Sequence, residues 1–374
     1  MPEETFRREV REWLSANLTG AFAELRGLGG PGREHEAFDL RVAWDRHLAA
    51  AGWTCLGWRG VPLERQVVFH EEYARSGAPS RVSHVGEELL GPTLLEFGTP
   101  EQRQRFLPPI EAVEELWCQG YSEPGAGSDL ASVATTAVLD GDEWMITGQK
   151  VWTSLAHVAD WCFALVRTEP GSRGHSGLSY LLVPMRQPGV VVRPIQQLTG
   201  TSEFNEVFFD GARTARENVV GEVGGGWRIA MATLGFERGV AMLGQQVGFR
   251  RQLDGIIALA QDRPDPVLRE QLTRAWLELH VMRSHALRTL EGPPGPESSV
   301  AKLFWAGWHR RLGELAMEAL GASSMVAQGP PYELDEWQRL FLFSRADTIY
   351  GGSDEVQRNI IAERILGLPR EVRA

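Results

Sequence analysis

Gly120-Tyr-Ser-Glu-Pro-Gly-Ala-Gly-Ser-Asp-Leu-Ala-Ser132 is the stretch of this 374-residue chain on which the assignment of its fold depends. Taken alone, the stretch is typical of a hydrophilic turn between two strands, because Gly, Pro, Ser and Asp are common turn residues. The pattern of apolar residues changes around it, since helical spacing precedes the stretch and short β-rich runs follow it. The stretch therefore lies where a helical domain leads into a β domain.

The middle of the chain, residues 118–222, predicts a small antiparallel β domain. Its apolar and β-branched residues form short runs, such as EWMITG at 143–148, WCFALVRT at 161–168 and GVVVRPI at 189–195. Asp-Gly, Pro-Gly and Thr-Gly dipeptides separate these runs. Short runs bounded by such turn signals are typical of strands joined by tight connections.

The first 117 residues are predicted to form a helical domain, because their apolar residues recur at helical spacing. A short helix is expected to begin at Pro100, with Thr99 as its N-cap residue. The pair Pro108 and Pro109 is expected to close that helix, because proline removes a backbone donor.

Residues 223–374 are predicted to be helical again. Long periodic stretches run over 226–261, 267–290 and 298–320, and a Pro/Gly-rich loop separates the last two. Antiparallel helices of this length suit a four-helix bundle. The expected fold class is α+β, with three domains at 1–117, 118–222 and 223–374.

Composition excludes several classes of function. The net charge of -11 argues against a nucleic-acid partner, which needs clustered positive charge. The three cysteines are widely spaced and show neither a disulfide framework nor the spacing of a zinc site, so no metal is expected. The charged start lacks the apolar core of a signal peptide, and no apolar run is long enough for a membrane span. We expect a cytoplasmic protein.

Three motifs in order carry a family resemblance: the opening stretch at 120–132, GQKVWTS at 148–154, and YGGSDEVQRNIIAERILGLPR at 350–370. Together they resemble the acyl-CoA dehydrogenase family, over essentially the whole chain and in the same α–β–α order. The resemblance implies FAD as cofactor, an acyl-CoA substrate, α,β-desaturation, and an electron-transferring flavoprotein as electron acceptor. It also implies a helical N-terminal domain, an antiparallel β middle domain and a C-terminal four-helix bundle.

The first two motifs imply contacts with a flavin, which needs polar partners at its edge and a wall beside its ring. By resemblance, Ser122 meets the pyrimidine end, Trp152 packs beside the ring, and Ser154 donates toward N5. Ser128 lies beside the pantetheine of the substrate or the flavin phosphates. Trp152 also has an ordinary alternative as a core residue, since the chain has 13 tryptophans. The full implied set of cofactor-binding residues is Tyr121, Ser122, Gly127, Ser128, Trp152, Thr153, Ser154, Tyr350, Ser353 and Glu355.

Removing a proton next to a thioester carbonyl requires a carboxylate held in a dry pocket. Many family members carry this Glu directly after the Tyr of the third motif, but here Gly351 follows Tyr350. Some branched-chain and long-chain relatives place it on a C-terminal helix just before an Arg. Glu237 is therefore our candidate base, and Arg238 is expected to orient CoA or brace the helix. The alternative is an exposed charged pair on a helix surface.

Three departures from the family pattern bear on assembly. The loop after Trp58 is shortened, the Arg-Phe-Gly element expected after Gly248 is poorly matched by Arg250 and Arg251, and the Gly-rich element at 319–329 is weakened. The last two resemble members that work as mixed tetramers, so a homodimer, a homotetramer and a heterotetramer with a sister subunit all stay open.

A flavin-dependent oxidase or monooxygenase of the same fold, and a pure partner subunit, are the competing functions. The motifs do not specify the length or branching of the acyl group, or whether CoA or a carrier protein bears it.

Overall fold

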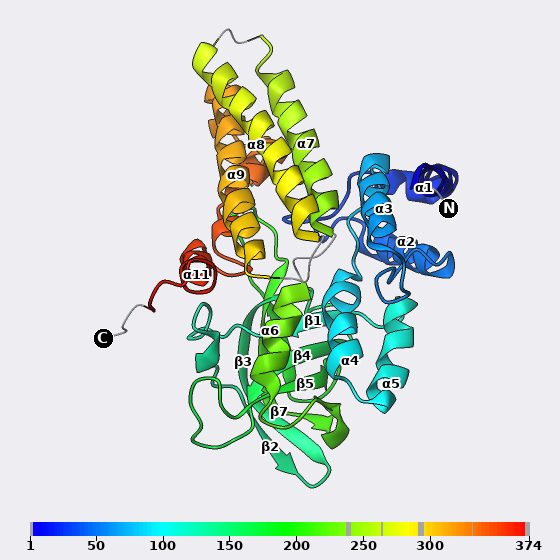
Figure 1. Ribbon diagram of the computed structural model, residues 1–374, viewed down its shortest axis with the longest axis vertical. Helices are drawn as coiled ribbons and strands as arrows, with labels where there is room; N and C mark the ends of the chain where they lie inside the picture. The colour runs from blue at the N-terminus through cyan, green and yellow to red at the C-terminus, as the bar shows by residue number, and fades with distance from the viewer. Residues whose placement is uncertain (1–2, 237–240, 263–264, 291–294, 331, 371–374) are drawn as a thin grey trace.

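The computed structural model describes residues 3–236, 241–262, 265–290, 295–330 and 332–370. The chain forms three parts, and Figure 1 shows a helical N-terminal part, a sheet, and a bundle of long helices standing above the sheet. The α, then β, then α order predicted from the sequence is confirmed.

The N-terminal part is built from helices, and local capping rules explain where one of them begins. Thr99 accepts a bond from the Gln102 N–H, and the Gln102 side chain accepts from the Thr99 N–H, which forms a capping box. The predicted end of this helix was wrong, because the helix continues through the proline pair and the Ala112 N–H still donates to the Pro108 carbonyl at 2.9 Å. The elements are α1 (Glu3–Asn17), η1 (Gly20–Leu25), α2 (Phe38–Ala50), α3 (Leu63–Ser76), the π-helix η2 (Val85–Leu90), α4 (Gly91–Phe97) and α5 (Pro100–Glu111).

The middle part is one sheet with the strand order β6-β7-β3-β2-β4-β5-β8. Most neighbours are antiparallel, but β1 pairs parallel with β4, with Cys118 opposite Cys162, and one parallel pair joins β2 and β4. The predicted antiparallel β domain is confirmed in most of its pairs, and the parallel pairing of β1 was not foreseen, because β1 enters from the helical domain and not through a hairpin. The strands are β1 (Trp117–Gly120), β2 (Thr136–Asp140), β3 (Glu143–Ser154), β4 (Trp161–Arg167), β5 (Leu178–Pro184), β6 (Val190–Pro194), β7 (Phe204–Ala215) and β8 (Val219–Val220).

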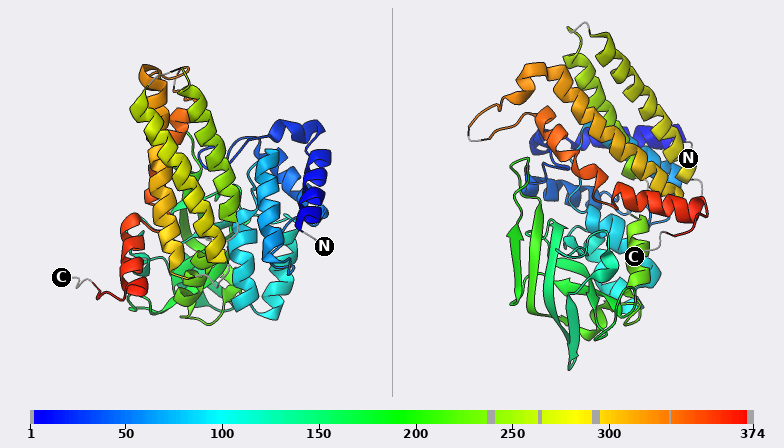
Figure 2. Two further views of the ribbon diagram at one scale, coloured as in Figure 1. Left: turned by 45° about the horizontal axis from the view of Figure 1, so that its top comes forward. Right: turned by 90° about the vertical axis from the view of Figure 1, so that its left-hand side faces the viewer.

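The C-terminal part contains the long helices, but the periodic stretch 226–261 is divided between two places. Figures 1 and 2 show that α6 lies on the sheet beside α4 and α5, whereas α7 stands in the bundle with α8 and α9. The shorter α10 packs against α9. No helix in the described ranges has both the length and the apolar content needed to cross a membrane. The helices are α6 (Gly226–Phe236), α7 (Ala241–Leu259), α8 (Pro266–Leu290), α9 (Glu297–Leu320), η5 (Gly321–Met325), α10 (Glu336–Phe343), η6 (Ala346–Thr348), α11 (Asp354–Ile360) and η7 (Ile361–Ile365).

η2, α4, α5 and α6 cover one face of the sheet over β4 and β5. Their packing against these strands forms a large apolar core. Ile229 and Ala230 bring α6 onto β5, where Tyr180 and Leu182 are fully buried. Burial of this area is the main force holding α6 against the sheet. α6 is therefore part of the sheet's apolar core and not of the bundle.

Candidate active site

The first two motifs lie side by side at one end of the sheet. The Val151 N–H donates to the Ser122 carbonyl at 2.9 Å, which joins the segment after β1 to the end of β3. The Lys150 ammonium donates to the Tyr121 carbonyl at 3.1 Å. Residues 120–123 and 150–154, which the sequence separates, therefore form one edge.

Lys150 is the centre of this edge, although the sequence analysis gave it no role. Its side chain is fully buried and its three N–H groups have three acceptors, the carbonyls of Tyr121 and Leu165 and the carboxylate of Glu123 at 2.7 Å. Glu123 also accepts from the backbone N–H groups of Ala134 and Thr135. Burial opposes ionisation of Glu123, but the charge of Lys150 and these bonds hold the pKa of Glu123 below its ordinary value.

Three hydroxyls along this edge have no partner in the described part of the chain. The Thr153 hydroxyl is fully buried and unpaired, and those of the half-buried Ser122 and Ser154 form no hydrogen bond with the described residues. Trp152 beside them is 58% exposed and adopts a φ of 61°, so it is not a core residue in this chain. A buried polar atom without a partner costs free energy, which a ligand with polar atoms along one side would remove. The edge therefore fits the polar rim and flat ring of a flavin.

Two residues of the first motif have open surroundings. A Cβ built on Gly127 would meet nothing within 4 Å, so the chain itself does not require glycine there. Ser128 is exposed. Both positions are accessible to a ligand, and their predicted contacts with cofactor and substrate stay predictions.

The third motif lies in the C-terminal part, where its residues have local structural roles. The Tyr350 hydroxyl donates to Asp347 at 2.7 Å, and the Ser353 hydroxyl accepts from the Val356 N–H as the N-cap of α11. Glu355 is exposed in the first turn of α11 and pairs with Arg358 at 3.6 Å. The structure thus brings together the first two motifs and places the third on a separate element.

A buried network behind Tyr350 was missed by the sequence analysis. His309 contacts Asp347 through Nδ1 at 2.6 Å and Gln252 through Nε2 at 3.0 Å, and Lys302 donates to the Asp347 carbonyl. Lys302 and His309 are seven residues apart, so they share one face of α9. This pair of basic residues on a mostly apolar helix face is the sequence signal that could have revealed the network.

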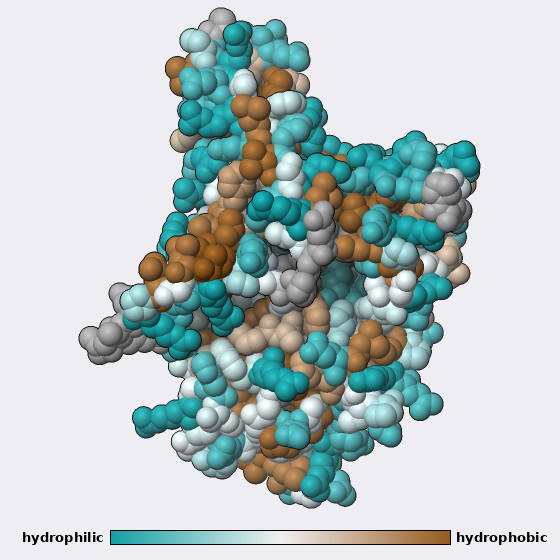
Figure 3. Space-filling model, in the orientation of Figure 1, coloured by the Kyte–Doolittle hydropathy of each residue, from teal (hydrophilic) through white to brown (hydrophobic). Residues whose placement is uncertain are grey.

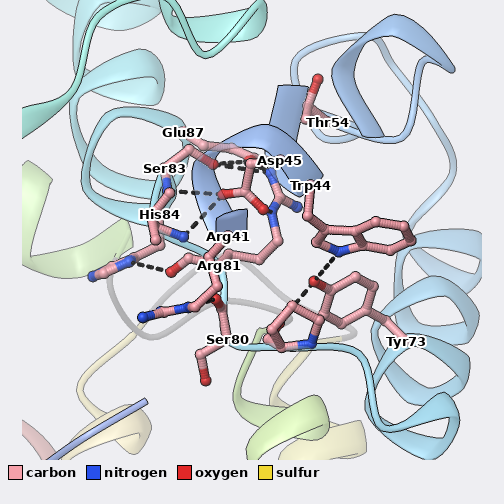
Figure 4. Close-up of polar contacts among 12 residues, drawn as sticks. Arg41, Trp44, Asp45, Thr54, Tyr73, Ser80, Arg81, Ser83, His84 and Glu87 are labelled. Carbon is pink, nitrogen blue, oxygen red and sulfur yellow. Dashed lines mark hydrogen bonds and ion pairs between the residues drawn. The ribbon is translucent and has the colours of Figure 1, made fainter. Parts of the chain in front are cut away.

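A buried polar cluster, drawn in Figure 4, joins α2 to η2 and to the residues just before η2. Asp45 accepts from Arg81 at 2.7 Å and from the N–H groups of Val82 and Ser83, while Arg81 also donates to Glu87 at 2.6 Å. Glu87 lies in η2, and π-helices are frequent at functional sites. The cluster fixes η2, and with it α4, against α2.

Trp58 precedes the loop that we expect to be shortened. Its indole N–H donates to the Glu87 carbonyl at 3.0 Å. A Cβ built on Gly91 would overlap the Trp58 ring at 1.5 Å, so the ring lies directly on the glycine. The Trp58 side chain is therefore packed on η2 and α4.

Glu237 and Arg238 lie outside the described residues, so the base assignment is not tested by the structure. α6, the helix that precedes them, ends at Phe236. Figure 3 shows a hollow in the surface where the three parts of the molecule meet.

Comparisons with known proteins agree with this architecture. The acyl-CoA dehydrogenase N-terminal, middle and C-terminal domain families match residues 2–114, 118–212 and 224–366. A three-domain acyl-CoA dehydrogenase is thus the class of protein defined by the fold. The chain belongs to the acyl-CoA dehydrogenase family, a family of oxidoreductases and flavoproteins.

Among its relatives, acyl-CoA dehydrogenase IpdE1 of Mycobacterium tuberculosis is 64% identical over 383 residues, covering 99% of each chain. The structure resembles that of the Tcur3481-Tcur3483 steroid ACAD, with a TM-score of 0.84, 30% identity and 99% coverage of each chain. It also resembles the ChsE4-ChsE5 complex from Mycobacterium tuberculosis, with a TM-score of 0.82 and 30% identity, covering 99% of this chain and 98% of that one.

Proposed function

We propose that this acyl-CoA dehydrogenase binds FAD along the edge formed by Ser122, Trp152, Thr153 and Ser154, and desaturates an acyl-CoA thioester between its α and β carbons. The observation that supports this is the buried, unpaired Thr153 hydroxyl beside the exposed Trp152 indole. When bound, the flavin accepts the hydride that leaves the β carbon.

The residues of the chain supply the proton chemistry and the orientation. In this proposal the α proton passes to the Glu237 carboxylate, which a dry pocket makes a stronger base. Arg238 and Ser128 hold the CoA part of the substrate. An electron-transferring flavoprotein removes the electrons, in the cytoplasm, where buried free thiols such as Cys118 and Cys162 stay reduced.

The test is the visible spectrum of the purified protein before and after anaerobic addition of saturated acyl-CoAs. Straight-chain, branched and steroid-derived polycyclic acyl groups form the panel, because one structural neighbour is titled a steroid ACAD. We expect the protein coexpressed with a sister subunit to be yellow, and its flavin band to bleach with a polycyclic acyl-CoA. Rapid reoxidation of the reduced flavin by air would instead favour an oxidase or monooxygenase of this fold.

Ser154→Ala is expected to slow reduction of the flavin about fivefold to tenfold, because it removes one hydrogen bond worth about 1 kcal/mol. Ser154→Thr keeps the hydroxyl and should retain the wild-type rate. Rapid-mixing absorbance under anaerobic conditions measures both variants. Equal rates in Ser154→Ala and the wild type would remove Ser154 from the flavin edge.

Exposed apolar residues of the C-terminal part support an oligomer in which another subunit covers them. Ile349 is 67% exposed, Leu366 64% and Met325 87%, and Figure 3 shows apolar surface in the region of α11. Arg250 and Arg251, the candidates for reaching across a dimer, instead bond to Asp254 and to the Arg75 carbonyl of their own chain. A structural neighbour is a complex of two named proteins, ChsE4 and ChsE5. These observations favour a heterotetramer with a sister subunit over a homotetramer or homodimer.

Light scattering and the flavin content of the chain purified alone test the assembly. A colourless or underloaded protein that becomes yellow on coexpression with a sister subunit is expected. A yellow homotetramer that is reduced by substrate without any partner would contradict the mixed assembly and leave the dehydrogenase function intact.

A further inference from the structure

Four hydroxyl-bearing side chains form a buried chain between the flavin edge and α6. The Thr93 hydroxyl of α4 lies 2.8 Å from the Thr233 hydroxyl of α6, and the Thr233 hydroxyl lies 3.5 Å from that of Tyr180 in β5. The Tyr180 side chain meets the edge of the Tyr121 ring, with ring centroids 6.2 Å apart. The first three side chains are fully buried and Tyr121 is 5% exposed.

Each threonine hydroxyl also has a carbonyl of its own helix within hydrogen-bond distance. Thr93 lies 2.7 Å from the Leu89 carbonyl, which can only accept, so the Thr93 hydroxyl donates to it. The Thr233 hydroxyl lies 2.8 Å from the Thr93 oxygen and 3.0 Å from the Ile229 carbonyl, and the Tyr180 oxygen accepts from Thr233 at 3.5 Å. Burial raises the pKa of Tyr180 well above its ordinary value, so its hydroxyl keeps its proton.

Ordinary helix geometry does not account for this arrangement. A Thr inside a helix commonly bonds the carbonyl four residues earlier, and this explains why Thr93 approaches Leu89 and Thr233 approaches Ile229. It does not explain why two such hydroxyls from different helices meet each other. The surroundings are apolar, since Tyr180 stacks on Phe163 with centroids 5.6 Å apart. Each hydroxyl also reaches a carbonyl of its own helix, but the direct contact between the Thr93 and Thr233 hydroxyls is made at only one rotation of α6 about its axis.

Both ends of the chain of hydroxyls are attached to rigid parts of the molecule. α4 follows η2, which the Asp45–Arg81–Glu87 cluster holds in place. At the other end, the Tyr121 carbonyl accepts from the buried Lys150. Thr233 lies in the last turn of α6, which ends at Phe236.

We infer that Thr93, Thr233 and Tyr180 are positioning residues, which hold the last turn of α6 at one rotation relative to Tyr121 and the flavin edge. The inference rests on the proposed function. Glu237 follows Phe236 directly in the sequence, and the rate of flavin reduction reports the proton removal that the proposal assigns to it. An error in the rotation of α6 misplaces a reacting group, and a misplacement of about 1 Å costs up to about 100-fold in rate.

The experiment compares Thr233→Val, Tyr180→Phe and Thr233→Ser in the flavin-loaded protein, with its sister subunit where one is needed. Val keeps the shape of Thr without the hydroxyl, and Ser keeps the hydroxyl. Thr214→Val is the matched control, since the buried Thr214 hydroxyl donates to the Leu182 carbonyl at 2.6 Å on another strand. Two quantities are measured: hydrogen exchange of the amides of 226–236, which needs no substrate, and the anaerobic rate of flavin reduction by the best acyl-CoA.

We expect Thr233→Val and Tyr180→Phe to exchange faster over 226–236 and to reduce the flavin about tenfold to 100-fold more slowly, with an unchanged substrate concentration at half-maximal rate. Thr233→Ser should restore both quantities, and Thr214→Val should change neither. Wild-type exchange over 226–236 in both hydroxyl-deleted variants would overturn the inference, as would an equal slowing by Thr214→Val. Glu237→Gln in the same series separates the base assignment from the positioning inference. If the flavin of this variant is reduced at the wild-type rate, the base assignment is refuted and the positioning inference is not.

Discussion

Glu237→Gln is expected to keep the flavin bound and to slow its reduction by an acyl-CoA by about 10²- to 10⁴-fold, the range that general-base catalysis contributes. Gln has nearly the shape of Glu, but its amide does not accept the α proton. Binding of substrate should survive, because the CoA contacts are made by other residues. The measurement is rapid mixing under anaerobic conditions, followed in the visible flavin band.

Glu143→Gln is a suitable control for this variant, because Glu143 is an exposed carboxylate that pairs with Arg213 at 3.2 Å. It should react at the wild-type rate. A Glu237→Gln enzyme as fast as the wild type would sink the base assignment. A variant that has lost its flavin would show instead that this carboxylate holds the structure of the site.

Local rules predicted some elements well. The capping box at Thr99 and Gln102 needs only residues three apart, so the beginning of α5 was readable from the sequence. The alternation of apolar residues likewise predicted the β domain. In contrast, the periodic stretch 226–261 was expected to be one helix of the bundle, and instead its first part packs on the sheet as α6. Periodicity reports that a helix has an apolar face, and it does not say which partner covers that face.

The site depends on contacts between distant residues, and these were the least predictable. The second motif was recognised with Lys150 inside it, but the partner Glu123 lies 27 residues earlier and is reached only through the packing of β3 beside the segment after β1. The same holds for the hydroxyl contact between Thr93 and Thr233, which are 140 residues apart. A family motif shows which residues recur together, whereas the register of strands and helices decides which atoms meet.

Lys150→Met is expected to lower the free energy of unfolding by about 3–5 kcal/mol, the cost of breaking a buried ion pair by removing one partner. The side chain of Met fills similar space, so the loss comes from the charge. It leaves the Glu123 carboxylate buried without its cation and removes the donor from the carbonyls of Tyr121 and Leu165. Urea unfolding measures the change, and flavin content should fall with it because Tyr121 borders the cofactor edge.

The comparison with an exposed pair decides whether burial is the cause. Arg213 contacts Asp140 at 3.0 Å and Glu143 at 3.2 Å on the same domain, but all three side chains face solvent, so Arg213→Met should cost less than about 1 kcal/mol. Adding Glu123→Gln to Lys150→Met should recover part of the lost stability, since the unpaired charge is then gone. If Lys150→Met were no more harmful than Arg213→Met, the three bonds of Lys150 would not be what joins the two motifs, and the packing of β3 against β7 would have to hold that edge by itself.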